Sequence, residues 1–214
     1  DWGYYNEKYK DEKYALNDEV VKPYLKLENV KKGVFMLANK LYGLNFTPND
    51  KIEVYHPDVT AYDVTDENGR FMAVLYLDFF PRESKRSGAW MTEFRGTKIE
   101  DGEETRPLVS LVMNFTKPTE TAPSLLTFDE LETFLHEFGH ALHGMLGEGK
   151  YESQTGTNVY RDFVELPSQL MENWAFDPEV LRQYAVHYRS NEVIPKYLVV
   201  KLRRSELFNQ GFMA

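Results

Sequence analysis

The sequence predicts an α+β protein that is mainly α-helical and carries a small β-sheet. Apolar residues recur with helical spacing in residues 1–50 and 127–209, and short alternating or β-branched runs occupy residues 51–116. Aromatic residues make up 14% of the chain, which is typical of a folded protein because disordered segments are poor in them. We therefore expect one ordered unit over residues 1–214, with helices, then a sheet, then helices.

Two helical segments are expected before the sheet. Residues 4–28 place apolar side chains at amphipathic spacing, and Pro23 can divide this segment into two helices because proline lacks a backbone N–H group. Residues 29–42 form a further helical run that ends at Gly43, a residue type that is common just beyond a helix.

Strands are expected in the middle of the chain. Two β-favouring runs flank the turn signal Asp66-Glu67-Asn68-Gly69, which predicts a hairpin. Residues 52–55 also alternate, and the charged segment 97–106 is expected to be a surface loop. The expected strands cover residues 60–65, 71–79, 89–94 and 108–115.

The clearest helix begins at Thr127. Thr127 and Glu130 have the Thr-x-x-Glu spacing of a capping box, and Gly147 and Gly149 are expected to end the helix. One apolar stripe runs along it through Leu131, Leu135, Phe138, Leu142 and Met145. Three more helices are expected over residues 161–176, 178–189 and 192–209.

Composition excludes several classes of function. The net charge of −9 argues against nucleic acid and anionic membrane surfaces as partners. The chain has no cysteine, which excludes disulfides, thiolate nucleophiles and cysteine-based metal sites. No stretch approaches the roughly 20 apolar residues of a membrane-spanning helix. Because the chain starts at Asp1 with neither an initiator Met nor a signal peptide, we expect it to be a piece of a longer protein.

The run His136-Glu137-Phe138-Gly139-His140 carries the chemistry. Residues four apart on a helix share a face, so the imidazoles of His136 and His140 can bind one zinc ion. Glu137 is offset by one residue, which places its carboxylate beside the ion as a general base for a bound water. Both histidines lie off the apolar stripe, so they do not simply fill the core.

Glu165 is the candidate third ligand. A catalytic zinc site takes three protein ligands and leaves a fourth position open. Glu165 follows His140 by 25 residues on an expected second helix, which leaves enough chain to fold back. Glu132 and Glu172 are each one or two turns from a ligand, and each can either accept a hydrogen bond from an imidazole or be solvated.

Other residues are weaker candidates. His143 shares the face of His136, but seven residues of helix separate them by roughly 10 Å, too far to bind the same ion. It can line a cleft, support a ligand or be structural, and the sequence leaves these roles open. His56 and His187 are isolated and are expected to be ordinary surface or core histidines. No Gly-x-Ser-x-Gly motif is present, so serine hydrolase chemistry has no support.

These segments resemble the thimet oligopeptidase family of zinc metallopeptidases. Residues 133–144 are similar to the zinc helix of that family, and residues 162–174 to its third-ligand helix. Within the family, the peptidyl-dipeptidase branch is the most similar. The runs that carry this branch resemblance are residues 28–30, 41–44, 76–85, 88–91 and 153–158.

The resemblance implies a cytoplasmic peptidase of zincin-like fold that acts on short peptides. It assigns zinc to His136, His140 and Glu165, and the general base to Glu137. The peptidyl-dipeptidase branch releases C-terminal dipeptides, whereas the oligopeptidase branch cuts internally. A non-catalytic metal-binding fragment is a further alternative.

The resemblance also implies parts that this sequence does not match. The family has a long N-terminal helical region and a later segment whose histidine and tyrosines contact the substrate. We therefore expect the chain to carry the zinc site of a larger helical peptidase, with little or no turnover on its own. Substrate is expected to add as a strand at Gly88–Met91, if this run lies at the sheet edge.

Overall fold

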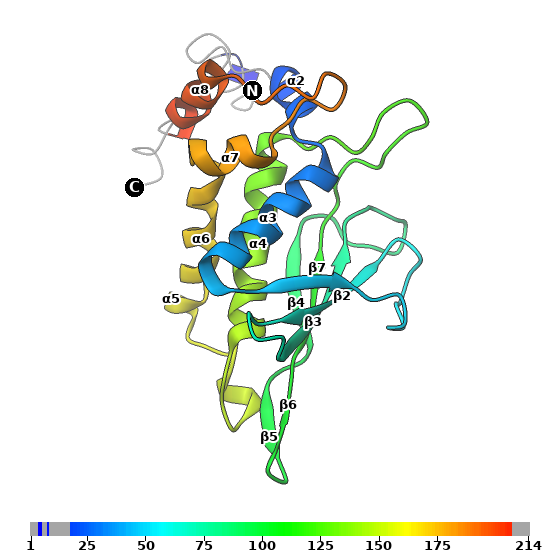
Figure 1. Ribbon diagram of the computed structural model, residues 1–214, viewed down its shortest axis with the longest axis vertical. Helices are drawn as coiled ribbons and strands as arrows, with labels where there is room; N and C mark the ends of the chain where they lie inside the picture. The colour runs from blue at the N-terminus through cyan, green and yellow to red at the C-terminus, as the bar shows by residue number, and fades with distance from the viewer. Residues whose placement is uncertain (1–3, 6–7, 9–17, 207–214) are drawn as a thin grey trace.

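The computed structural model describes residues 4–5, 8 and 18–206, and it has the α+β architecture predicted from the sequence. Helices lie against one face of a five-stranded sheet (Figure 1). The main core joins this face to the helices, through residues such as Leu75, Leu111 and Phe138. A smaller cluster around Val74 and Tyr76 occupies the opposite face. No helix in the described part of the chain combines the length and hydropathy needed to cross a bilayer.

The first helices are divided at Pro23. Helix α2 (Asp18–Val21) is followed by the 3₁₀ helix η1 (Lys22–Tyr24), and α3 (Leu27–Tyr42) starts after a short extended stretch. This confirms the division, although most of the expected 4–28 helix lies outside the described residues. Gly43 has a φ of 69° and its N–H bonds the Asn39 carbonyl, which ends α3 where the sequence predicts.

The sheet has the order β1-β2-β3-β7-β4. The predicted hairpin is confirmed, because β2 pairs with β3 in antiparallel register. β3 and β7 are parallel, and β4 runs antiparallel to β7 at one edge of the sheet. The strands are β1 (Asn45–Pro48), β2 (Thr60–Thr65), β3 (Phe71–Asp78), β4 (Trp90–Arg95) and β7 (Leu108–Val112).

Three details of the sheet region differ from the prediction. β1 lies in a region expected to be helical, where Phe46 stacks on Phe35 of α3 with ring centroids 4.1 Å apart. Residues 52–55 form no strand, because Ile52 and Val54 pack from a loop onto the second core cluster. The predicted loop 97–106 contains the hairpin β5 (Lys98–Glu100) and β6 (Glu103–Thr105). The two residues at its turn, Asp101 and Gly102, both have positive φ, as a tight hairpin requires.

Helix α4 (Phe128–Leu146) matches its prediction closely. The Thr127 side chain accepts the Glu130 N–H, and the Glu130 carboxylate accepts the Thr127 N–H, so the capping box is confirmed. The apolar stripe is buried along its whole length, which presses α4 onto β3, β4 and β7. His136 and His140 lie off this stripe and are part-buried.

The predicted helix 161–176 is broken at Glu165. It consists of α5 (Arg161–Val164), α6 (Leu166–Glu172) and the 3₁₀ helix η3 (Asn173–Ala175). Pro167 has no N–H to bond the Phe163 carbonyl, which explains the break. The last two helices are also shorter than predicted: α7 is Pro178–Tyr184 and α8 is Lys196–Glu206, while residues 207–209 lie outside the described residues.

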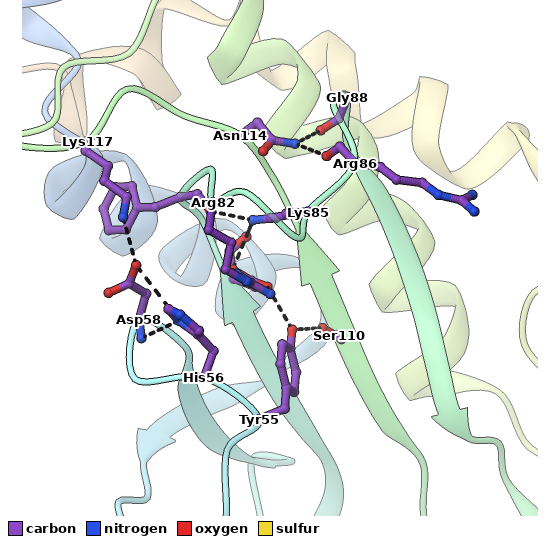
Figure 2. A network of polar contacts seen from close by, with 12 residues as sticks. Tyr55, His56, Asp58, Arg82, Lys85, Arg86, Gly88, Ser110, Asn114 and Lys117 are labelled. Atoms are coloured by element: carbon purple, nitrogen blue, oxygen red, sulfur yellow. Dashed lines mark hydrogen bonds and ion pairs between the residues drawn. The ribbon is translucent and has the colours of Figure 1, made fainter.

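A buried ion cluster anchors the connection between β3 and β4. Asp78 is 1% exposed, and its carboxylate accepts two bonds from Arg82, at 2.8 and 2.9 Å, and one from Lys85 at 2.9 Å. The hydroxyl of Tyr55 donates to the same carboxylate, and it also lies 3.1 Å from Ser110 Oγ (Figure 2). Burial raises the pKa of Asp78, but the hydrogen bonds from Arg82 and Lys85 outweigh it, so the pKa is lowered overall.

Asp78→Asn should destabilise the fold by about 3 kcal/mol, because it leaves the buried Lys85 ammonium without its counter-charge. The lowered pKa gives the pH dependence its sign. The stabilisation is complete above the ordinary Asp range, near pH 4, and is lost as pH falls through the lower folded value. Denaturant unfolding of both proteins at pH 7 and in acid measures this, with the exposed Asp50→Asn as control. A loss for Asp78→Asn no larger than that of the control would contradict the prediction.

Candidate metal centre

His136 and His140 lie one turn apart on α4, with 27% and 12% of their side chains exposed. Their ring centroids are 4.9 Å apart and the rings are nearly perpendicular. Burial lowers the pKa of His140, which favours the neutral imidazole that binds metals. The structure therefore brings the two histidines together as their i, i+4 spacing predicts.

Glu165 completes a group of three donors. It lies at the break between α5 and α6, and its Oε2 atom is 3.3 Å from His136 Nε2 and 3.1 Å from His140 Nε2. Donors bound at about 2.0–2.1 Å to one tetrahedral ion lie roughly 3.3 Å apart, so these separations fit a shared ion. Among the described residues, this is the group whose His, Asp or Glu donors lie close enough to hold a metal.

The approach of α6 to α4 depends on Gly139. A Cβ atom at this position would lie 2.6 Å from the Pro167 carbonyl oxygen and 2.6 Å from Ser168 Cα, both of which are backbone atoms. Ser168 is fully buried at this contact, and its hydroxyl donates to Glu165 Oε2 at 2.8 Å. This bond is the main reason that the pKa of Glu165 is lowered. Sequence reasoning missed Ser168, because a buried serine has no distinguishing local pattern.

Glu172 contacts His136 on the side of the ring away from Glu165. Its carboxylate contacts His136 Nδ1, the ring nitrogen that faces away from Glu165. A carboxylate at this nitrogen fixes the tautomer with the proton on Nδ1, which leaves the Nε2 lone pair for a metal. The sequence left Glu172 open between this role and solvation, and the contact with His136 favours the first.

Glu137 is buried beside the donor group. Burial raises the pKa of Glu137, the neighbouring His136 lowers it, and the backbone N–H of Met91 on β4 faces its carboxylate. A cavity of about 300 Å³ joins Glu137 to the three donors, and β4 forms one of its walls. Its lining residues are Ala89, Trp90, Met91, His136, Glu137, His140, Thr157, Val164 and Glu165.

The remaining histidines lie apart from this group. His143 is half-buried, with a pKa that burial lowers, and its ring packs edge-on against Phe163. His56 Nδ1 accepts the Asp58 N–H, and His187 Nδ1 accepts the N–H groups of Arg189 and Ser190. These local bonds agree with the structural roles expected for His56 and His187.

A helix-borne histidine pair, a distant glutamate and an adjacent buried glutamate form an arrangement that is typical of metallopeptidase centres. A family comparison agrees: the model of peptidase family M3 matches residues 1–214, so the chain belongs to this family. This confirms the family resemblance inferred from the sequence.

Curated relatives carry peptidase names. The dipeptidyl carboxypeptidases of Salmonella typhimurium and Escherichia coli are 45% and 43% identical to this protein over 99% of the chain. Oligopeptidase A of Escherichia coli is 39% identical over 94% of the chain. The chain spans about 30% of the length of these relatives.

His140→Ala should weaken Zn²⁺ binding by more than about 100-fold, because it removes one of three donors. Loss of a residue that only supports a ligand typically costs about 10–100-fold in metal affinity. Elemental analysis after loading and dialysis measures the stoichiometry. His187→Ala is the matched control, since His187 lies outside the donor group and its loss should keep the wild-type stoichiometry. Equal zinc content in all three proteins would refute the assignment of His140.

Proposed function

We propose that this chain carries the zinc site of a cytoplasmic peptidase with a zincin-like core, and that His136, His140 and Glu165 are the zinc ligands. The observation that carries the proposal is the convergence of three donors on one point, from α4 and from the α5–α6 junction. Two imidazoles and one carboxylate form the donor set of catalytic zinc sites. The resemblance to intracellular zinc peptidases supports the location.

Glu137 acts as the general base in this proposal. His136, His140 and Glu165 would hold the zinc ion, which would supply Lewis acidity to the scissile carbonyl and to water when bound. Glu137 takes the proton from the attacking water and later delivers it to the leaving amine. Its burial and raised pKa suit both steps, because a carboxyl group whose pKa lies closer to neutral both accepts and returns a proton readily.

Peptide substrate binds as an additional strand along β4. β4 is an edge strand of the sheet, and Ala89, Trp90 and Met91 line the same cavity as His136 and Glu137. An edge strand offers backbone N–H and C=O groups to an extended peptide independently of its side chains. This mode suits an enzyme that acts on many short peptides.

Release of C-terminal dipeptides is the proposed reaction. The higher identity to the dipeptidyl carboxypeptidases than to oligopeptidase A supports it. Internal cleavage is the second candidate, favoured by the presence of oligopeptidase A among the relatives. Because the chain spans about 30% of their length, the activity belongs to a longer polypeptide that includes this segment.

Glu137→Gln, introduced into such a longer polypeptide, should lower kcat for peptide hydrolysis by about 10²–10⁴-fold, because it removes the general base. Zinc content should stay unchanged, since Glu137 is not a donor in the metal group. The exposed Glu120→Gln serves as control and should retain wild-type kcat. Retained turnover in a zinc-loaded Glu137→Gln protein would exclude Glu137 as the base.

Digestion of a peptide of about ten residues by the same longer polypeptide should yield C-terminal dipeptides in succession. Mass spectrometry of the products over time measures this. A parallel digestion of the C-terminally amidated peptide is the control, because an exopeptidase that reads the free carboxylate should cut it poorly. Early internal fragments, produced equally from both peptides, would show that internal cleavage is the correct reading.

A further inference from the structure

The β3–β4 connection, residues 79–89, ends at the edge of the metal-centre cavity. It follows Asp78 at the end of β3 and leads directly into Trp90 at the start of β4. Ala89 belongs to this connection and already lines the cavity. The position of the peptide-binding edge therefore depends on how this connection is held.

The near end of the connection is held by the buried Lys85. Its Nζ atom donates to the Asp78 carbonyl at 3.0 Å and to the Phe80 carbonyl at 2.8 Å, in addition to the Asp78 carboxylate. The Lys85 side chain is 2% exposed, so these bonds are shielded from water. They fix the first half of the connection against the end of β3.

The far end is held by Asn114, which lies two residues beyond β7. Its Nδ2 atom donates one hydrogen bond to the Arg86 carbonyl at 2.8 Å and another to the Gly88 carbonyl at 2.7 Å (Figure 2). Trp90 pairs with Val112 in the β4–β7 ladder, so Asn114 stands opposite Gly88 when this register is continued. The Asn114 side chain thus extends the ladder beyond the last backbone pair.

Backbone geometry explains why a side chain is used here. Gly88 has a φ of 91°, a conformation that departs from a regular strand. The chain turns at this residue just before it becomes the sheet edge. Three residues later, the Met91 N–H faces the carboxylate of Glu137. A shift at Gly88 is therefore passed along a short, extended segment to the wall of the site.

We propose that Asn114 is a positioning residue for peptide binding, which orders Gly88–Met91 as the docking edge through its two bonds to Arg86 and Gly88. The inference rests on the proposed function, because it assumes that peptide binds along β4. Without Asn114, the two carbonyls bond water instead and the segment samples more conformations. Peptide binding must then order it, and that ordering lowers affinity.

Asn45 provides a matched control at the opposite edge of the sheet. Its Nδ2 atom also donates to two carbonyls, those of Gly43 and Asp66, where β1 begins. Asn45→Ala therefore removes the same chemical group and two donated bonds, together with the bond that Asn45 Oδ1 accepts from Asn39 Nδ2, far from β4 in the strand order. Neither asparagine belongs to the donor group, so zinc binding should be unchanged in both variants.

The first measurement is hydrogen exchange of the zinc-loaded chain. Asn114→Ala should speed exchange in the segment 87–91 by about tenfold and leave α4 unchanged, whereas Asn45→Ala should leave the segment 87–91 as in wild type. This readout does not depend on peptidase function. Unchanged exchange at 87–91 in Asn114→Ala, or equal acceleration by both variants, would overturn the proposal.

The second measurement is calorimetric titration with a short peptide whose scissile amide is replaced by an uncleavable methylene-amine link. Asn114→Ala should raise Kd by about tenfold, while Asn45→Ala stays within twofold of wild type. Wild-type Kd in Asn114→Ala would overturn the role in peptide binding. If the zinc-loaded wild type does not bind the peptide, the proposed peptide site on this chain fails, and the exchange result still decides whether Asn114 orders the edge.

Discussion

The candidate site depends on the close approach of two helices at Gly139. The metal group needs Glu165 within about 3.3 Å of two imidazoles on α4, and the backbone of α6 can come that close only where α4 has no side chain. Gly139 lies between His136 and His140, so the surface that presents the histidines also admits the helix that brings the carboxylate. Because α6 lies this close, its Ser168 bonds Glu165 and its Glu172 contacts His136.

Glycines also allow α4 to pack closely against the edge of the sheet. A Cβ atom on Gly144 would lie 2.4 Å from Glu93 Oε1, and one on Gly156 would lie equally close to that oxygen. Glu93 of β4 is thus enclosed between α4 and the loop that contains Thr157. Met91 of β4 and Thr157 of this loop both line the metal-centre cavity, so the packing around Glu93 joins two of its walls. The three donors depend on the contact between α4 and α6 at Gly139, and the edge strand β4 depends on the contact around Glu93.

Much of this arrangement follows from local patterns in the sequence. The capping box, the apolar stripe and the i, i+4 histidines predict α4 and its outward face, since all three depend on residues within a few turns. The hairpin β2–β3 is equally local. The break at Glu165 could have been read from Pro167, but the helical periodicity of residues 161–176 hid it. β1 was missed because its stability comes from Phe46 stacking on Phe35, a tertiary contact that no pattern within Asn45–Pro48 reveals.

The partners that orient the site were the least accessible to sequence reasoning. Ser168, Asn114 and the choice of Glu172 depend on segments that meet only in the folded chain. Their residue types are common on any surface, so type and spacing carry little information about them. By contrast, the i, i+4 histidine spacing and the family resemblance together pointed to His136, His140 and Glu165, and the structure places these three side chains close together.

The break at Glu165 has a thermodynamic consequence. The third donor comes from a junction between two short helices, 25 residues after His140, and not from within a long, self-supporting helix. A metal ion bound there closes a loop whose ends are otherwise joined by the packing of α6 at Gly139 and by the contact of Glu172 with His136. Such an ion binds the folded chain and not the unfolded one, so at 100 times its Kd it adds about 2.7 kcal/mol to stability. The folding equilibrium of this region therefore becomes a function of free metal concentration, and the segment from α4 to α6 behaves as a unit that the ion itself helps to assemble.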